Sequence, residues 1–260
     1  MNRNNKNAVD NTGVKKKYRW INDIEPVFME DSKRNYGHRT WTNAEWSDIT
    51  LALAVDMDSP GEITTRKAAE DKYVGFTIPT DLSERCLSSL AEAITKRIRK
   101  HPKFKTDELK LNIAGNSQIT LDKYCIRTSV IRELLKLVLL DLADSGVKFS
   151  MIRSGGQTGV DEAGIQAAQD AGLKCSILAP KGFRMHREPG IELEGRSLFV
   201  KRFREAFPGS MTTARFRSTA ATVCSSTPRS APTRAACASI RRSTCPSSSS
   251  LASSRSSKTP

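Results

Sequence analysis

Short, mostly apolar runs alternate with stretches of helical periodicity through most of this chain of 260 residues. The runs cover residues 47–57, 72–79, 109–121, 147–152 and 174–180. A strand covered by helices on both faces is apolar throughout, whereas a half-exposed strand alternates apolar with polar residues. The pattern therefore predicts an α/β fold: one Rossmann-like parallel sheet of about five strands, with helices on both faces, over residues 20–208.

Helices are predicted in the intervals between these runs. Apolar residues recur at helical spacing over 63–70, 82–98, 129–146, 160–172 and 197–207. Gly146 and Gly172 close two of these patterns, as glycine commonly does where a helix ends. Parallel strands need such crossover connections, so the helices support the same fold class.

A glycine-rich turn, Ser154 to Gly159, joins the fourth apolar run to the helix that follows it. Gly155, Gly156 and Gly159 lack Cβ atoms where the strand turns sharply, so backbone N–H groups can converge on one ligand. Such a turn suits an anion, usually a phosphate, but it can also be purely architectural. The hydrogen-bonding side chains at this turn favour a ligand site: Ser154, Gln157, Thr158 and Asp161.

Other predicted strands end in residues of the same kind, over Asp56 to Thr65, Gly115 to Ser117 and Lys181 to Gly182. Each stretch could be an ordinary loop. In a parallel sheet, however, ligands bind at the carboxyl ends of the strands, so these loops should lie together. Beyond the glycine turn, the predicted ligand-binding residues are Gly61, Thr64, Thr65, Gly115, Asn116, Ser117 and Lys181.

The charged residues near these turns have more than one interpretation. Asp161 could cap the helix, accept from a ribose hydroxyl or hold a cation, because its carboxylate would repel a phosphate bound at the same place. Lys181 either supplies positive charge for a phosphate or is a solvated loop residue. The candidate catalytic acids are Asp56, Glu62 and Asp161, and His186 is expected at the surface.

The two ends of the chain differ in composition from the predicted domain. Residues 1–19 are polar and basic and are expected to be flexible. Residues 209–260 contain 15 serines, eight Lys or Arg and no Asp or Glu, which predicts a disordered tail or a segment translated out of frame. Since 34 of the 42 basic residues and all 28 acidic ones precede the tail, the body carries a net charge of only about +6.

Nothing in the sequence predicts a metal site. No C-x-x-C pair occurs, and the three histidines are scattered: His38, His101 and His186. No signal peptide is visible and no apolar run is long enough to span a bilayer, so a cytoplasmic location is expected. The cofactor, if any, stays open.

The motifs resemble those of a known family. "SGGQTGVDEAG" followed by "LAPKG" is similar to the molybdenum carrier-like proteins of the SLOG superfamily, relatives of the LOG-type phosphoribohydrolases and the DprA-like proteins. That family's middle and closing motifs resemble "WSDITLALAVDMDSPGEITTRKAAEDKYVGFTI" and "LKLNIAGNSQITL", which here come before the glycine turn. The resemblance therefore implies a circularly permuted arrangement over about Trp41 to Gly182.

One departure from the LOG-type pattern bears on catalysis. Residues 59–69, "SPGEITTRKAA", resemble the P-G-G-x-G-T-x-x-E loop of those enzymes. The position that holds the family's catalytic glutamate falls near Arg66 to Ala69, where this chain has no acid. The resemblance therefore implies binding of a nucleotide more strongly than its hydrolysis.

Three functions are expected from these features. The first is a sensor or carrier-like protein that binds a nucleotide or nucleotide-derived phosphate ligand, with Gly155, Gly156 and Thr158 holding phosphate and Asp161 reading ribose. The alternative is a nucleoside monophosphate N-glycosidic hydrolase in which Asp161 or Glu62 assists loss of the base. The third is weak, DprA-like nucleic-acid binding through the basic surface. We also expect no membrane partner and a homo-oligomer, and the turn could hold a molybdenum oxyanion.

Overall fold

The computed structural model of the protein describes residues 8–9, 15–16, 22 and 24–204. The predicted tail, 209–260, lies outside these residues. So does most of the predicted flexible segment, 1–19, apart from two paired antiparallel strands, β1 (Ala8–Val9) and β2 (Lys15–Lys16).

The main sheet has six parallel strands in the order β3-β8-β7-β6-β4-β5. Its members are β3 (Val27–Glu30), β4 (Ile49–Ala54), β5 (Tyr73–Thr77), β6 (Leu109–Gly115), β7 (Phe149–Ser154) and β8 (Cys175–Ala179). The five predicted strands and the Rossmann-like arrangement are confirmed. Strand β3 was not predicted, because it is a short edge strand with no fully buried residue.

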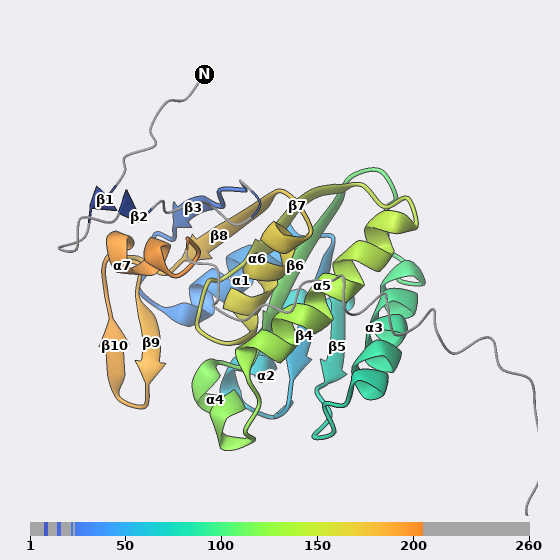
Figure 1. The fold of residues 1–260 in the computed structure, drawn as a ribbon, viewed down its shortest axis with the longest axis horizontal. Coiled ribbons are helices and arrows are strands. Elements are labelled where there is room, and N and C mark those ends of the chain that lie inside the picture. Colours follow the sequence, from blue (N-terminus) through green and yellow to red (C-terminus); the bar gives the residue numbers. More distant parts are fainter. Residues whose placement is uncertain (1–7, 10–14, 17–21, 23, 205–260) are drawn as a thin grey trace, which may run out of the picture. The chain divides into compact units, whose positions relative to one another are not determined.

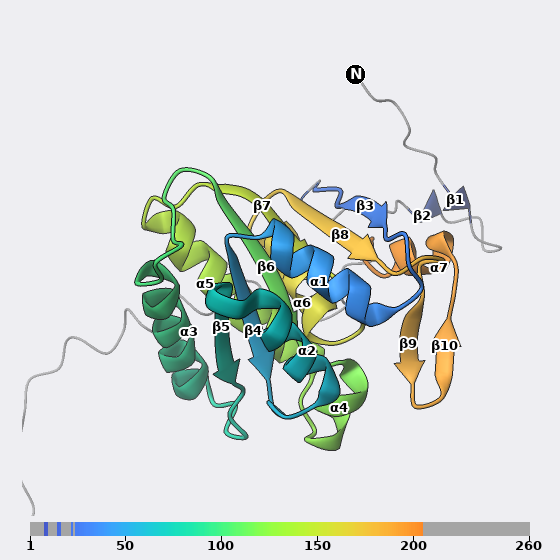
Figure 2. The ribbon, with the colours of Figure 1, turned by 180° about the vertical axis from the view of Figure 1, so that it is seen from behind.

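Helices cover both faces of this sheet. They are α1 (Tyr36–Trp46), α2 (Pro60–Ala69), α3 (Glu84–Arg99), α4 (Gln118–Lys123), α5 (Thr128–Asp144), α6 (Val160–Asp170), α7 (Arg196–Lys201) and the 3-10 helix η2 (Glu70–Lys72). Figure 1 shows α5 and α6 across one face with α3 beside α5, and Figure 2 shows α1 and α2 across the other. The described residues include no helix long and apolar enough to cross a bilayer.

Three local predictions need correction. The strand predicted over 109–121 ends at Gly115, and α4 begins at Gln118, because the chain turns at Ser117 to form an isolated bridge with Gly159. The last helix is shorter than the predicted 197–207. Residues 185–193, which no strand prediction covered, form a hairpin of β9 (Met185–Glu188) and β10 (Ile191–Leu193).

The core lies on both faces of the central strands. Every residue of β4 is buried, and α5 buries an apolar stripe that includes Leu135, Val138 and Leu142. Helices α5 and α6 are also joined by a buried ion pair, in which Arg132 Nε and Nη2 donate to the two carboxylate oxygens of Asp170 at 2.7 Å each. This pair fixes the position of α6, the helix that follows the glycine turn.

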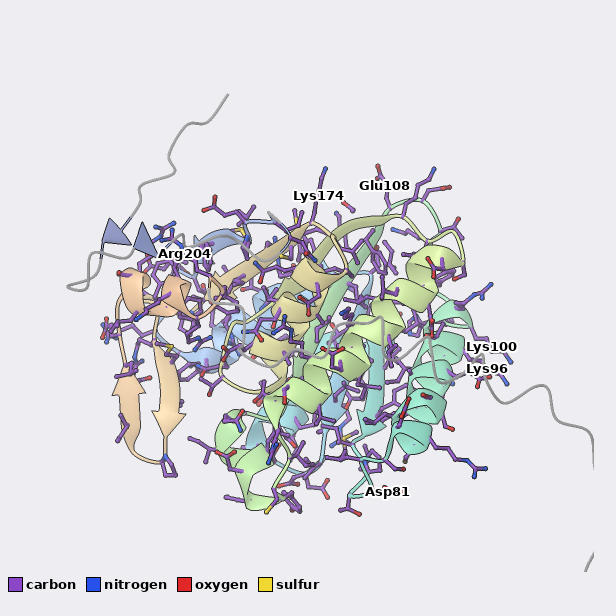
Figure 3. The ribbon with its side chains drawn as sticks, viewed as in Figure 1. Asp81, Lys96, Lys100, Glu108, Lys174 and Arg204 are labelled. Atoms are coloured by element: carbon purple, nitrogen blue, oxygen red, sulfur yellow. The ribbon has the colours of Figure 1, made fainter. Side chains whose placement is uncertain are left out.

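The strand order places a topological switch point between β4 and β6. After β4 the chain continues to one side, to β5, and after β6 it continues to the other side, to β7 and β8. In Figure 3, Glu108 and Lys174, which precede β6 and β8, lie at the amino edge of the sheet, while Asp81, which follows β5, lies at the carboxyl edge. Loops that diverge at a switch point leave a crevice at the carboxyl edge, where α/β proteins bind ligands.

Candidate functional site

A cleft of about 480 Å³ lies at this switch point. Its walls come from α1, the first turns of α2, the end of β6, the glycine turn and His186 on β9. Its volume is in the range of roughly 300–1,000 Å³ that small-molecule sites occupy. The carboxyl-edge location expected from the sequence is therefore where the structure has a cleft.

The predicted site residues divide into two groups. Those that line the cleft are Gly61, Glu62, Thr64, Thr65, Gly115, Asn116, Ser117, Gly155, Gln157 and Asp161. Those outside its lining are Asp56, Ser154, Gly156, Thr158, Gly159 and Lys181. The cleft thus brings together residues from three predicted loops that are far apart in the sequence.

Most of the glycine turn has a structural role. A Cβ on Gly156, which has φ +68°, would lie 2.5 Å from Ile177 and Phe199 in the core. A Cβ on Gly159 would lie 2.5 Å from the backbone nitrogen of Gln118, and Thr158 Oγ1 donates to the carbonyl of His186 at 2.7 Å. These contacts fit the architectural interpretation of this part of the turn.

Gly155 differs, because it lies against an arginine of the cleft. Arg39 Nη1 donates to the carbonyl oxygen of Gly155 at 2.7 Å, and a Cβ at position 155 would lie 2.2 Å from Arg39 Cζ. Arg202 Nη2 donates a hydrogen bond to the next carbonyl oxygen, that of Gly156. The two arginines therefore hold the turn by its carbonyl groups, and Arg39 brings a positive charge to the cleft that the sequence analysis missed.

Asp161 is buried beside Arg39, with 3.3 Å between Oδ2 and Nη1. It also accepts at 3.4 Å from the backbone N–H of Gln157, which precedes α6, while the N-cap of α6 is Gly159 and no side chain caps this helix. Burial raises the pKa of Asp161, and the nearby charge of Arg39 opposes this only in part. The predicted cap role of Asp161 is therefore wrong, because Asp161 lies within the first turn of α6, whereas its position in the cleft lining leaves a role in ligand binding open.

Glu62 is the second buried carboxyl of the cleft, with 2% of its surface exposed. Its Oε1 accepts from the hydroxyl of Tyr73 at 2.6 Å, while Oε2 has no partner among the described residues. Burial raises the pKa of Glu62, and the negative charge of Asp161 adds to this. A carboxyl with a raised pKa in a cleft is typical of functional sites.

Both polar atoms of the Asn116 side chain form hydrogen bonds within the protein. Its Oδ1 accepts from the N–H groups of Val55 and Asp56, and its Nδ2 donates to the carbonyl of Asp56 and to Ser59 Oγ. The side chain thereby fixes the loop between β4 and α2, so it shapes the cleft.

Several other polar atoms of the cleft are buried without a protein partner. Within the described residues, five such atoms form no hydrogen bond: Arg39 Nε, Asn43 Oδ1, Glu62 Oε2, Asn112 Oδ1 and Gln157 Nε2. Each unsatisfied buried polar group costs about 1–3 kcal/mol, and native proteins contain few of them. Five of the eleven such atoms in the described residues belong to side chains that line this cleft, which makes the cleft a candidate site for a polar molecule.

Two rings in contact with each other, those of Tyr36 and His186, line the cleft. The rings of Tyr36 and His186 are 5.0 Å apart, and the backbone N–H of His186 donates to Gln157 Oε1 at 3.2 Å. Tyr36 also donates to Glu192, and burial with this hydrogen bond raises the pKa of Tyr36 to about 12. His186 is at the surface as predicted, with 43% of its side chain exposed, but it also lines the cleft and packs against Tyr36, which the sequence did not indicate.

The chain matches no protein-family model, no curated protein and no solved structure. Among the described residues there is also no group of three or more His, Cys, Asp or Glu that could hold a metal ion. The function is therefore argued from the cleft.

The raised pKa of Glu62 predicts a pH-dependent effect of Glu62→Gln on stability. A carboxyl whose pKa rises on folding stabilises the fold fully below its unfolded pKa, and this contribution is lost as pH rises through the folded pKa. Glutamine cannot lose a proton, so the melting temperature of the variant should rise relative to wild type as the pH is raised above 4.5, the ordinary pKa of a glutamate. A difference in melting temperature that stays constant over this range would contradict the assignment.

Proposed function

We propose that the cleft binds a nucleotide or nucleotide-derived ligand, in a sensor or carrier-like protein. The observation that carries the proposal is the set of buried, unpartnered polar atoms on Arg39, Asn43, Glu62, Asn112 and Gln157 in a switch-point cleft. A polar ligand of nucleotide size fits both the cleft volume and these groups. Membership of the SLOG superfamily stays a prediction that agrees with this proposal.

The phosphate of this ligand belongs at the start of α2. Asp161 lies beside the glycine turn, where its Oδ2 accepts from the N–H of Gln157, and its carboxyl disfavours an anion at that turn. Helix α2 is ten residues long, and its first turn, with Ser59 and Gly61, lines the cleft. A helix N-terminus favours anions through its dipole and free N–H groups. In this turn Pro60 has no N–H and Ser59 Oγ accepts from the N–H of Glu62, so the N–H of Gly61 is the donor offered to the ligand. We therefore move the phosphate from the predicted Gly155, Gly156 and Thr158 to Gly61.

The alternative, N-glycosidic hydrolysis of a nucleoside monophosphate, is favoured by one observation. Although 66–69 contain no acid, Glu62 and Asp161 both line the cleft, and burial raises the pKa of each. A protonated carboxyl could assist departure of the base. Chromatography of each nucleotide after incubation with the protein separates the two functions, since only the hydrolase releases free base.

Gly61 allows a direct test of ligand binding. A Cβ at this position has nothing within 4 Å, so Gly61→Leu should fold normally while its side chain obstructs the cleft. We expect calorimetry with the four common nucleoside 5′-monophosphates to find one that wild type binds and that this variant binds about tenfold more weakly or less. Lys67→Leu, on an exposed position of α2 outside the cleft lining, is the matched control and should bind like wild type.

Two outcomes would contradict the proposal. One is the absence of binding by wild type to all four monophosphates. The other is equal binding by wild type and the Gly61→Leu variant, since Gly61 lines the cleft and lies in the turn proposed to hold the phosphate.

A further inference from the structure

Glu62 is the neighbour of Gly61 in the first turn of α2. It lines the same cleft, and only 2% of its surface is exposed. The positive end of a helix dipole stabilises a carboxylate as it stabilises a bound phosphate. An ionised Glu62 and a phosphate at Gly61 therefore compete for the same end of α2 and repel each other.

The surroundings of Glu62 favour its protonated form. Burial raises its pKa, and the charge of Asp161 on α6 acts in the same direction, against the hydrogen bond from Tyr73 on β5 and the charge of Arg66. Arg66 is half exposed and donates to a backbone carbonyl of the loop before α2, so water screens its charge. Arg39 on α1 lies 3.3 Å from the carboxylate of Asp161, so its charge acts first on that group. Glu62 therefore gains and loses its proton at a higher pH than an exposed glutamate does.

Groups other than Glu62 can also change their charge near neutral pH. His186 on β9 lines the cleft, and the phosphate of a nucleotide loses its second proton at about pH 6. Tyr36 stays neutral, because burial above all raises its pKa to about 12. The remaining ionisable residues of α1, β6 and η2, which contact α2, lie outside the cleft lining: His38, Glu45, Lys110, Glu70, Asp71 and Lys72. A substitution of Glu62 separates its contribution from those of His186 and the phosphate.

We propose that Glu62 makes ligand binding depend on a proton: the anionic group at Gly61 binds when Glu62 is protonated and is repelled when Glu62 is ionised. The inference rests on the proposed binding of a nucleotide and adds how occupancy of the cleft is regulated. Two like charges about 7 Å apart, at an effective dielectric constant of about 20, weaken binding by about tenfold to a hundredfold. The affinity is therefore full below the pKa of Glu62 and falls as the pH rises through it.

The test is calorimetry of wild type and Glu62→Gln with the tightest-binding of the four common nucleoside 5′-monophosphates, between about pH 5 and about pH 8. Glutamine has the shape of a protonated glutamate and does not titrate. We expect the affinity of the variant, relative to that of wild type, to rise about tenfold or more across this range. Glu84→Gln is the matched control, because it makes the same change at an exposed position in the first turn of α3, and it should keep the wild-type profile.

Two further measurements do not depend on the glutamine variant. Calorimetry in buffers of different ionisation enthalpy should show that wild type takes up protons as it binds at a pH where Glu62 is ionised. Tyr73→Phe keeps the ring but removes the hydrogen bond that favours the ionised carboxyl, so the pKa of Glu62 rises further and tight binding should persist to a higher pH. Absence of proton uptake, or a shift of the Tyr73→Phe profile toward lower pH, would overturn the inference.

The outcomes distinguish this inference from the proposal on which it rests. Identical pH profiles of folded wild type and Glu62→Gln would overturn the inference and leave nucleotide binding intact, since His186 or the phosphate would then be the source of any pH dependence. Failure of every monophosphate to bind at every pH would overturn the nucleotide proposal together with the inference.

Discussion

Replacing Gly156 with valine is expected to lower the free energy of unfolding by about 4 kcal/mol. Two effects add. The backbone at this position has φ +68°, which a β-branched residue adopts only with strain, and the new Cβ would lie 2.5 Å from Ile177 and Phe199. Phe199 is fully buried and cannot move away cheaply. Urea denaturation followed by circular dichroism measures the loss.

Gly61→Val is the control for this substitution. It adds the same side chain to the same edge of the sheet, but in open space and at a position without positive φ. We expect its free energy of unfolding to stay within about 0.5 kcal/mol of wild type. If both glycine variants unfold at the same urea concentration as wild type, Gly156 does not face the core.

Replacing Asp170 with alanine is expected to lower the free energy of unfolding by about 3–5 kcal/mol. The change removes both carboxylate hydrogen bonds of Arg132, whose side chain is only 6% exposed, from the contact between α5 and α6. The loss comes mainly from the desolvated guanidinium that remains. Thermal and urea unfolding of the variant give the value.

An exposed ion pair provides the contrast. Lys105 is 2.7 Å from Asp48 but 60% exposed, so Lys105→Ala should cost less than about 1 kcal/mol. The double variant Arg132→Met with Asp170→Leu should recover most of the stability, because it leaves no charge buried. An Asp170→Ala variant as stable as Lys105→Ala would show that the buried pair contributes little.

The sequence was sufficient to predict the sheet, but it did not predict α1, which forms one wall of the cleft. Strands such as β4 are buried on both faces, and this burial requires the apolar runs that the sequence shows. Helix α1 has no such signal, because two of its three buried residues are polar, Arg39 and Asn43. Both side chains line the cleft. The buried polar residues that suit α1 for binding therefore also leave it without the apolar periodicity from which a helix is predicted.

The glycine turn shows a second limit of prediction. The sequence reveals where Cβ atoms are missing, but not the direction in which each missing Cβ would point. The structure separates the neighbours Gly155, which faces Arg39 in the cleft, from Gly156, which faces the core. For Glu62 the sequence was sufficient, because Glu62 was a predicted candidate acid and the first turn of α2 brings it to the cleft.

The central claim, that a nucleotide binds in this cleft, is tested most directly by NMR of ¹⁵N-labelled protein titrated with the tightest-binding nucleoside 5′-monophosphate. The account predicts shifts in the backbone signals of Gly61 and Gly155 and in the side-chain amides of Asn43 and Asn112. The side-chain amide of Gln169, which donates to the carbonyl of Ile24 outside the cleft lining, should not move. Shifts confined to surfaces outside the cleft, such as the exposed Lys96 of α3 and Lys100 at its end in Figure 3, would contradict it.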